Sequence, residues 1–154
     1  MTRATATTLL LGALLAGCAD DPRAWMTDVR AASERADAAE ARGDHAAAID
    51  ALEAILSREA PRGLAAEDLR VVRQDAHERL GRASLARGDV DRAAAHAREG
   101  LALGEREEIF TANLLALAGR VAEARGDDRE AARAYHRALV IHEALLERAL
   151  GGER

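Results

Sequence analysis

The residues most able to do nucleophilic or metal chemistry are one cysteine and five histidines. A metal site encoded in local sequence needs histidine, cysteine or acidic residues at short, regular spacings, and a lone cysteine leaves no second thiolate. Two of the histidines lie six residues apart near the C-terminus, which places them on different sides of a helix. No metal or cofactor is therefore predicted at the histidines, which are His45, His77, His96, His136 and His142.

The serines and glycines also lack the pattern of a catalytic site. Ser33, Ser57 and Ser84 lie in alanine-rich helical stretches, and none has the G-x-S-x-G surroundings of a nucleophile elbow. The glycines mark helix ends and helix crossings rather than a phosphate-binding loop. The sequence predicts a protein that is not an enzyme.

Cys18 follows a stretch that has the order of a secretory signal. Arg3 is the only charged residue before Asp20, and apolar residues are dense from Leu9 to Leu15. This stretch is shorter than the roughly 20 residues that span a bilayer. A single cysteine also excludes a disulfide within the monomer. Three interpretations remain: a lipidated N-terminus, a signal peptide with a chance cysteine, or a buried cysteine in a cytosolic helix.

The four residues Leu15-Ala16-Gly17-Cys18 resemble the lipobox of bacterial lipoproteins. The resemblance implies that a diacylglyceryl group is attached to Cys18, that the preceding peptide bond is cut, and that the new N-terminus is acylated. Ala19 stands where an aspartate often retains such lipoproteins in the inner membrane, so the periplasmic face of the outer membrane is slightly favoured over the inner membrane. The predicted segments are a signal peptide (1–17), a lipidated linker (18–21), a helical domain (22–150) and a flexible tail (151–154).

Composition predicts an all-α domain. Of the 154 residues, 49% are hydrophobic and only 2% aromatic, while 32% are charged. Strong helix formers dominate and β-branched residues are scarce, which argues against a sheet. The net charge of −5, with no basic tail, excludes nucleic acid as an expected partner. Six helices are predicted over residues 22–42, 45–58, 64–87, 90–103, 106–125 and 128–150. Trp25 is predicted to pack in the core, with insertion into the membrane interface as the alternative.

One tetrapeptide, Ala-Arg-Gly-Asp, occurs three times, at 41–44, 86–89 and 124–127. Arginine in the last turn suits the negative end of a helix dipole, glycine closes the helix in a left-handed conformation, and aspartate caps the next helix. Each copy therefore predicts the turn of an antiparallel helical hairpin. The turn residues are Gly43, Asp44, Gly88, Asp89, Gly126 and Asp127.

Small residues recur at fixed distances from each turn, and this pattern resembles the tetratricopeptide repeat. The resemblance implies a short α-solenoid of about three antiparallel hairpins, with small residues where helices cross closely. Its repeats are longer here than the usual length of about 34 residues, which predicts longer helices and a loop near Pro61. The predicted crossing residues are Ala36, Ala48, Gly81, Ala93, Gly100, Gly119, Ala131 and Ala138.

The resemblance also implies a concave face, lined by the first helix of each hairpin, that binds a protein or peptide partner. The outer face of the last helix is a second predicted surface, able to pair with another copy. The expected function is a membrane-anchored, non-catalytic scaffold or adaptor in a cell-envelope assembly, and the alternative is a small-molecule or peptide-binding accessory or sensor subunit. The predicted groove residues are Asp37, Glu40, Asp75, Glu78, Arg82, Asn113, Arg120 and Glu123.

Overall fold

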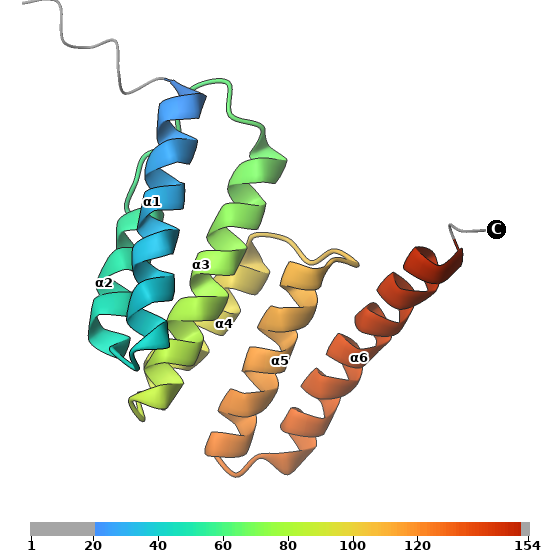
Figure 1. The fold of residues 1–154 in the computed structure, drawn as a ribbon. Coiled ribbons are helices and arrows are strands. Elements are labelled where there is room, and N and C mark those ends of the chain that lie inside the picture. The colour runs from blue at the N-terminus through green and yellow to red at the C-terminus, as the bar shows by residue number, and fades with distance from the viewer. Residues whose placement is uncertain (1–20, 152–154) are drawn as a thin grey trace, which may run out of the picture.

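A computed structural model describes residues 21–151, and the described residues form six α-helices and no strand. The all-α class predicted from composition is therefore confirmed. Figure 1 shows the helices in chain order from blue to red. They are α1 (Pro22–Ala41), α2 (His45–Leu56), α3 (Ala66–Ala86), α4 (Val90–Ala102), α5 (Ile109–Ala124) and α6 (Asp128–Gly151).

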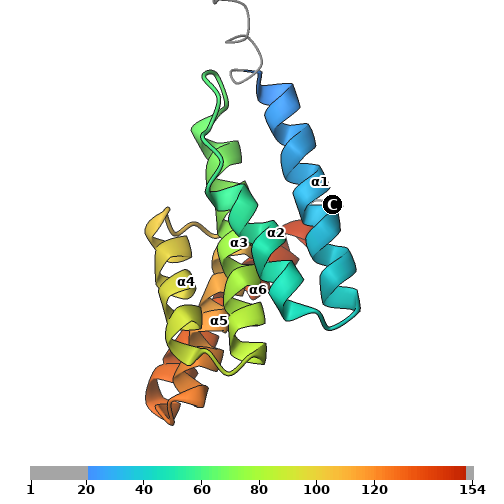
Figure 2. The ribbon, with the colours of Figure 1, turned by 90° about the vertical axis from the view of Figure 1, so that its left-hand side faces the viewer.

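Each helix packs against the next one in the chain, and α3 also packs along α5. Successive helices run in opposite directions, as Figure 1 and the side view in Figure 2 show. The most extensive pairings are α5 with α6, α3 with α4, and α1 with α2. These three pairs are joined by the shortest connections in the chain, which are the three Ala-Arg-Gly-Asp turns.

The three turns have one backbone geometry. Gly43, Gly88 and Gly126 adopt φ values of 69°, 77° and 75°, which a side chain would strain. After each glycine, the aspartate N–H donates back to a carbonyl oxygen five residues earlier at 2.9 Å, the bond of a Schellman motif. The same aspartate accepts a bond from a backbone N–H of the next helix; for Asp127 the donor is Glu130, at 2.9 Å.

The eight predicted crossing residues are all buried. Three of them are glycines that admit a neighbouring side chain. A Cβ on Gly119 would lie 2.5 Å from the Tyr135 ring, and one on Gly100 would lie 2.6 Å from Leu114. A Cβ on Gly81 would collide with Leu117. These contacts bring the helices together more closely than any larger residue would permit.

Two apolar clusters form the core. The first joins α1, α2 and α3 and contains Trp25, which is only 4% exposed, so the prediction that Trp25 lies in the core is confirmed. The second joins α4 and α5 around Leu114 and Leu117. Much of each cluster is alanine, which buries little area per residue.

One predicted helix start is wrong. The helix expected over 106–125 begins at Ile109, because residues before it bond elsewhere. The Arg106 N–H donates to the Thr111 hydroxyl at 3.1 Å, and the Glu108 carboxylate pairs with Arg70 of α3. The other predicted helix ends differ from the observed ends by at most two residues.

No helix among residues 21–151 is both long enough and apolar enough to cross a bilayer. The predicted signal peptide, Cys18 and residues 152–154 lie outside the described residues. Gly151, which was assigned to the flexible tail, is the last residue of α6.

Candidate functional site

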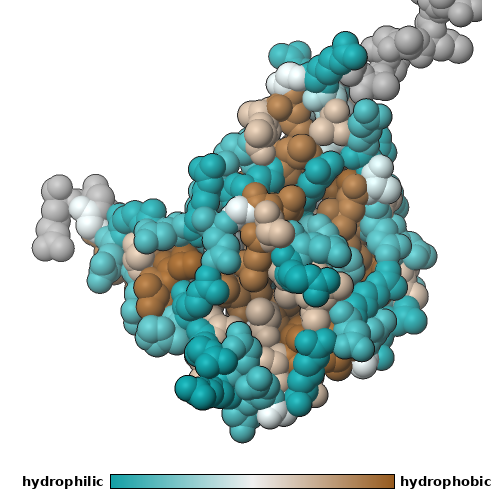
Figure 3. Space-filling model, turned by 180° about the vertical axis from the view of Figure 1, so that it is seen from behind, coloured by the Kyte–Doolittle hydropathy of each residue, from teal (hydrophilic) through white to brown (hydrophobic). Residues whose placement is uncertain are grey.

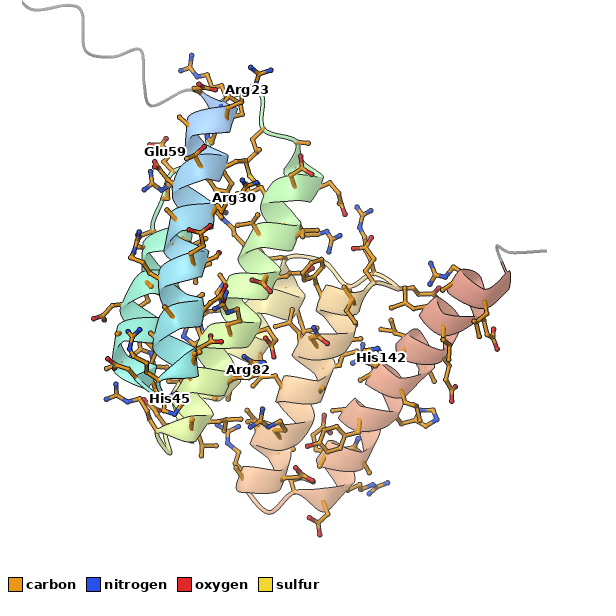
Figure 4. All side chains as sticks on the ribbon, in the orientation of Figure 1. Arg23, Arg30, His45, Glu59, Arg82 and His142 are labelled. Carbon is orange, nitrogen blue, oxygen red and sulfur yellow. The ribbon has the colours of Figure 1, made fainter. Side chains whose placement is uncertain are left out.

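Five of the predicted groove residues come together where α1 faces α3. Arg79 of α3, which was not predicted, joins them. Its guanidinium lies 2.6 Å from Asp37 Oδ1 and donates through Nε to Glu40 Oε1 at 3.1 Å. Arg82 adds a longer contact of 3.4 Å to Glu40 Oε2. Figure 4 labels Arg82 on α3. We call this set the α1–α3 polar face; its residues are Asp37, Glu40, Asp75, Glu78, Arg79 and Arg82.

The polar face links α1 and α3 in addition to the apolar cluster that joins both helices with α2, and the two backbones do not approach closely. Arg79 has only 11% of its side chain exposed, so its charge is shielded from water and held by two carboxylates. Partly buried ion pairs of this kind orient helices more than they stabilise them. The predicted groove charges therefore engage each other instead of standing free for a ligand.

The negative charges of Asp75 and Glu78 are only partly balanced by the arginines of the polar face. Burial raises the pKa of Asp75, although the nearby Arg79 acts in the opposite direction. Burial also raises the pKa of Glu78, against the charge of Arg82. Desolvation disfavours the charged form of a carboxyl group, so both side chains carry an electrostatic cost at neutral pH.

The three predicted groove residues of α5 behave differently. Arg120 is exposed and near enough to Glu78 for its charge to lower the pKa of that group. Glu123 turns to α6 and accepts a bond from the Tyr135 hydroxyl at 2.5 Å, which together with burial raises the pKa of Tyr135 to about 12. Among the described residues, no hydrogen bond joins Asn113 to the polar face. The predicted groove is thus continuous only over α1, α3 and Arg120.

A second cluster of titratable groups lies between α3 and α4. The Nδ1 atoms of His77 and His96 are 3.2 Å apart, and Glu99 Oε2 is 3.8 Å from His77 Nδ1. Burial lowers the pKa of both histidines, which favours neutral imidazole rings. The Nε2 atom of His96 is buried and has no hydrogen-bond partner among the described residues. We call these residues the histidine cluster.

Residue spacing along the chain missed the histidine cluster because the two rings come from different helices, 19 residues apart. The hairpin register does contain the signal. Gly81 and Ala93 are small residues seven before and five after Gly88, at the close crossing of this hairpin. His77 lies one helical turn before Gly81 on α3, and His96 lies one helical turn after Ala93 on α4. Antiparallel helices therefore bring these two positions together.

A third group of buried polar side chains fastens α3 to the end of α4. Gln74 is fully buried; its amide donates to the carbonyl oxygens of Gly100 at 3.2 Å and Gly104 at 2.9 Å. Its own oxygen accepts from Arg70 at 2.5 Å. Arg70 also pairs with Glu67 and Glu108, and these bonds raise its pKa. The arrangement satisfies helix-end carbonyls, which is a structural role.

The last helix leaves a row of apolar side chains in water. Leu139, Leu146 and Leu150 are 54%, 58% and 62% exposed, and their spacing puts them on one stripe of α6. The helix has 24 residues and its neighbour α5 has 16, so the C-terminal part of α6 extends beyond α5. Figure 3 shows hydrophobic side chains at the left, next to the grey C-terminal residues. We call Leu139, Leu146 and Leu150 the α6 stripe.

A groove of about 550 Å³ lies between α4, α5 and the start of α6. Its floor is apolar, with Ala97, Leu101 and Val121 among the lining residues. Arg98 and Glu130 are among the charged residues of its wall. A hollow of this size is within the range of small-ligand sites.

Comparisons of the chain with protein-family models, with curated proteins and with solved structures found no match. The proposals for its function therefore rest on the residues and contacts described above. Three places in the described residues support them: the histidine cluster, the α6 stripe and the groove between α4, α5 and α6, which we call the α4–α6 groove.

Proposed function

We propose that the chain is a bacterial lipoprotein, held by Cys18 at the periplasmic face of the outer membrane, that serves as a non-catalytic scaffold for a protein partner. The α6 stripe is the observation that carries the scaffold role. Three large apolar side chains, each more than half exposed, form one row on one helix. Monomeric soluble proteins rarely leave such surfaces without a binding role.

The anchor rests on the sequence Leu15-Ala16-Gly17-Cys18 and on its distance from the domain. The first helix begins at Pro22, four residues after Cys18, with Asp21 as its N-cap. A helix that starts so soon after a lipidated residue would keep the domain at the membrane surface. More than one acyl chain on Cys18 would make the attachment stable, since a single chain binds only marginally.

The scaffold itself is proposed to be a short solenoid of three tetratricopeptide-like hairpins. Three turns of one geometry, each followed by an aspartate cap, support this arrangement. The buried small residues at matching distances from each turn support it too. A solenoid exposes its terminal helix unless a capping element covers it, and α6 is that terminal helix.

We propose that the partner presents an amphipathic helix to the α6 stripe. Leu139, Leu146 and Leu150 share one stripe of α6, which suits the packing of one helix along another, and the stripe is interrupted by Glu143. The α1–α3 polar face is less suited to a partner, because Arg79 already pairs with Asp37 and Glu40. Any ligand there would first have to break these pairs.

Two experiments test the proposal. Metabolic labelling with palmitate should tag the full chain in bacteria, and Cys18→Ser should abolish the label; a labelled Cys18→Ser chain would contradict the anchor. A photo-crosslinking residue at position 146 should capture one protein of defined mass from intact membranes. The same residue at His136 (exposed, on α6) serves as the matched control. A product of twice the chain's own mass would instead identify a second copy as the partner.

The α4–α6 groove supports the alternative, a small-molecule or peptide-binding accessory subunit. Its apolar floor and charged wall suit a ligand that has an apolar part and a charged part. Ala94→Phe would obstruct the groove, because Ala94 lines it and is only half-buried. If a folded Ala94→Phe chain loses its function in cells while Leu146→Glu keeps it, the alternative is favoured over the scaffold.

A further inference from the structure

We propose that the histidine cluster binds a divalent transition-metal ion, with His77 Nδ1, His96 Nδ1 and the Glu99 carboxylate as ligands and zinc as the best-fitting metal. The site is independent of the proposed docking surface, since it lies between α3 and α4 and the stripe lies on α6. Imidazole nitrogens combined with a carboxylate are a donor set that zinc accepts, whereas calcium and magnesium take oxygen ligands.

The distances match a shared metal. Two imidazole nitrogens bound to one tetrahedral zinc, at about 2.05 Å each, lie about 3.3 Å apart. The two Nδ1 atoms are 3.2 Å apart in the structure. Glu99 Oε2 is 3.8 Å from His77 Nδ1, and the Glu99 side chain is 54% exposed, so a small rotation can bring its oxygen into the same shell. All three donor atoms lie within 4.8 Å of one another.

The backbone supplies the ligands from two helices. His96 and Glu99 are three residues apart on α4 and so project from one side of that helix. His77 comes from α3, the other helix of the same hairpin. At the crossing, Gly100 leaves the space that His77 fills, because a Cβ on Gly100 would lie 3.1 Å from the His77 Cβ. The ligands are thus held by regular structure and not by loops.

Within the described residues, each of the two Nδ1 atoms has the other as its hydrogen-bond partner. Two neutral imidazoles that face each other through Nδ1 can share one proton, donated by one ring to the other. The His96 Nε2 atom meanwhile has no partner among the described residues. A metal ion would use both Nδ1 lone pairs at once, and the proton shared between them would move to the Nε2 atom of the ring that carries it.

The middle hairpin differs from the other two at these positions. Eleven residues before and eight after the turn glycine, the first hairpin has Ala32 and Ala51. The third has Leu115 and Ala134. All four are buried and apolar. The other two hairpins therefore pack at this level with apolar side chains alone, whereas the middle hairpin has two histidines.

Titration of the purified full-length chain with Co²⁺ and Zn²⁺ tests the site. We expect one equivalent of Co²⁺ to bind and to give the visible absorption of a tetrahedral complex, and Zn²⁺ to displace it. Zn²⁺ should also raise the unfolding temperature, because a ligand that binds only the folded state stabilises it. His96→Gln and Glu99→Gln should each weaken binding by about tenfold or more, because even the loss of a residue that only supports a metal ligand typically costs that much.

His136→Gln and Glu143→Gln are the matched controls, since both residues are exposed on α6. Figure 4 labels His45 at the start of α2 and His142 on α6, two helices that contribute no ligand to the proposed site. The side chain of Glu99 faces solvent, so Glu99→Gln keeps the test valid even if His96→Gln fails to fold. Absence of saturable Co²⁺ or Zn²⁺ binding by the wild-type chain would overturn the proposal. Unchanged affinity in folded Glu99→Gln, with weaker binding in a control, would overturn the ligand assignment.

Discussion

The side-chain amide of Gln74 donates a hydrogen bond of 2.9 Å to the carbonyl oxygen of Gly104, just beyond the end of α4. The same amide donates to the Gly100 carbonyl oxygen, one of the last carbonyls of α4. Carbonyls at a helix C-terminus have no partner within the helix, and here a buried side chain from α3 supplies one. Gln74 therefore sets where α4 stops and how the following connection leaves it.

Gln74→Leu should lower the free energy of unfolding by about 1–3 kcal/mol, because it removes three hydrogen bonds at a buried position and leaves the Gly104 carbonyl oxygen without its partner. Urea denaturation followed by circular dichroism measures the change. Asp68→Asn, at an exposed position of the same helix, should have little effect. Equal stability of Gln74→Leu and wild type would show that water satisfies these groups.

Gly81→Ala should be destabilising by about 1–3 kcal/mol through overpacking. The added Cβ collides with Leu117, which is 1% exposed and has no free space to move into. Gly119→Ala should cost less, because the Tyr135 ring that it meets is only half-buried and can swing outward. Gly151→Ala, which meets nothing within 4 Å, is the control. The reverse order in thermal unfolding would contradict this packing.

Asp75→Asn should raise the free energy of unfolding at pH 7. Burial raises the pKa of Asp75 in the folded state above its ordinary value of 3.8, so the folded state binds a proton more tightly than the unfolded state. The cost of the buried charge is therefore full above the folded-state pKa and disappears as the pH falls toward the unfolded value. The gain from Asp75→Asn should shrink over the same range, whereas Arg79 keeps its pairs with Asp37 and Glu40.

Unfolding of both chains at several pH values between 7 and 4 measures this linkage. Asp50→Asn, at an exposed position of α2, controls for the loss of one negative charge. A difference between Asp75→Asn and wild type that stays constant with pH would show that the effect comes from packing and not from charge.

Leu146→Glu should leave the free energy of unfolding within about 0.5 kcal/mol of wild type, because the side chain is already 58% exposed. The same change should abolish crosslinking to the proposed partner. Leu114→Ala, at a fully buried position, should cost about 2–5 kcal/mol. Comparing folding and crosslinking in the two variants separates a docking role from a core role. A strong loss of stability in Leu146→Glu would place Leu146 in the core.

The helix ends of this protein follow from local sequence, because the interactions that make them are local. A glycine at positive φ and an aspartate cap involve residues within one turn of each other, and the three Ala-Arg-Gly-Asp copies show both. The start of α5 shows where this reasoning fails. Glu108 pairs with Arg70, which lies 38 residues away, and no local pattern contains that partner.

The candidate sites also contain parts that the sequence predicts and parts that depend on how the helices pack. The sequence placed Asp37, Glu40 and Arg82 on one face, but Arg79, which bridges them, was not identified. Its role depends on how α1 leans against α3. The sequence predicts an exposed outer face on the last helix, but how far α6 extends beyond α5 depends on how the two helices pack.

By itself the sequence determined that the chain is helical and where its hairpins turn, since helix propensity and capping act over a few residues. It also holds the lipobox-like Leu15–Cys18, which no fold is needed to recognise. Only the tertiary structure decided that His77 and His96 meet and that the charges between α1 and α3 pair with each other. Those contacts arise from the angle and depth at which helices cross, which are set by the packing of many side chains at once.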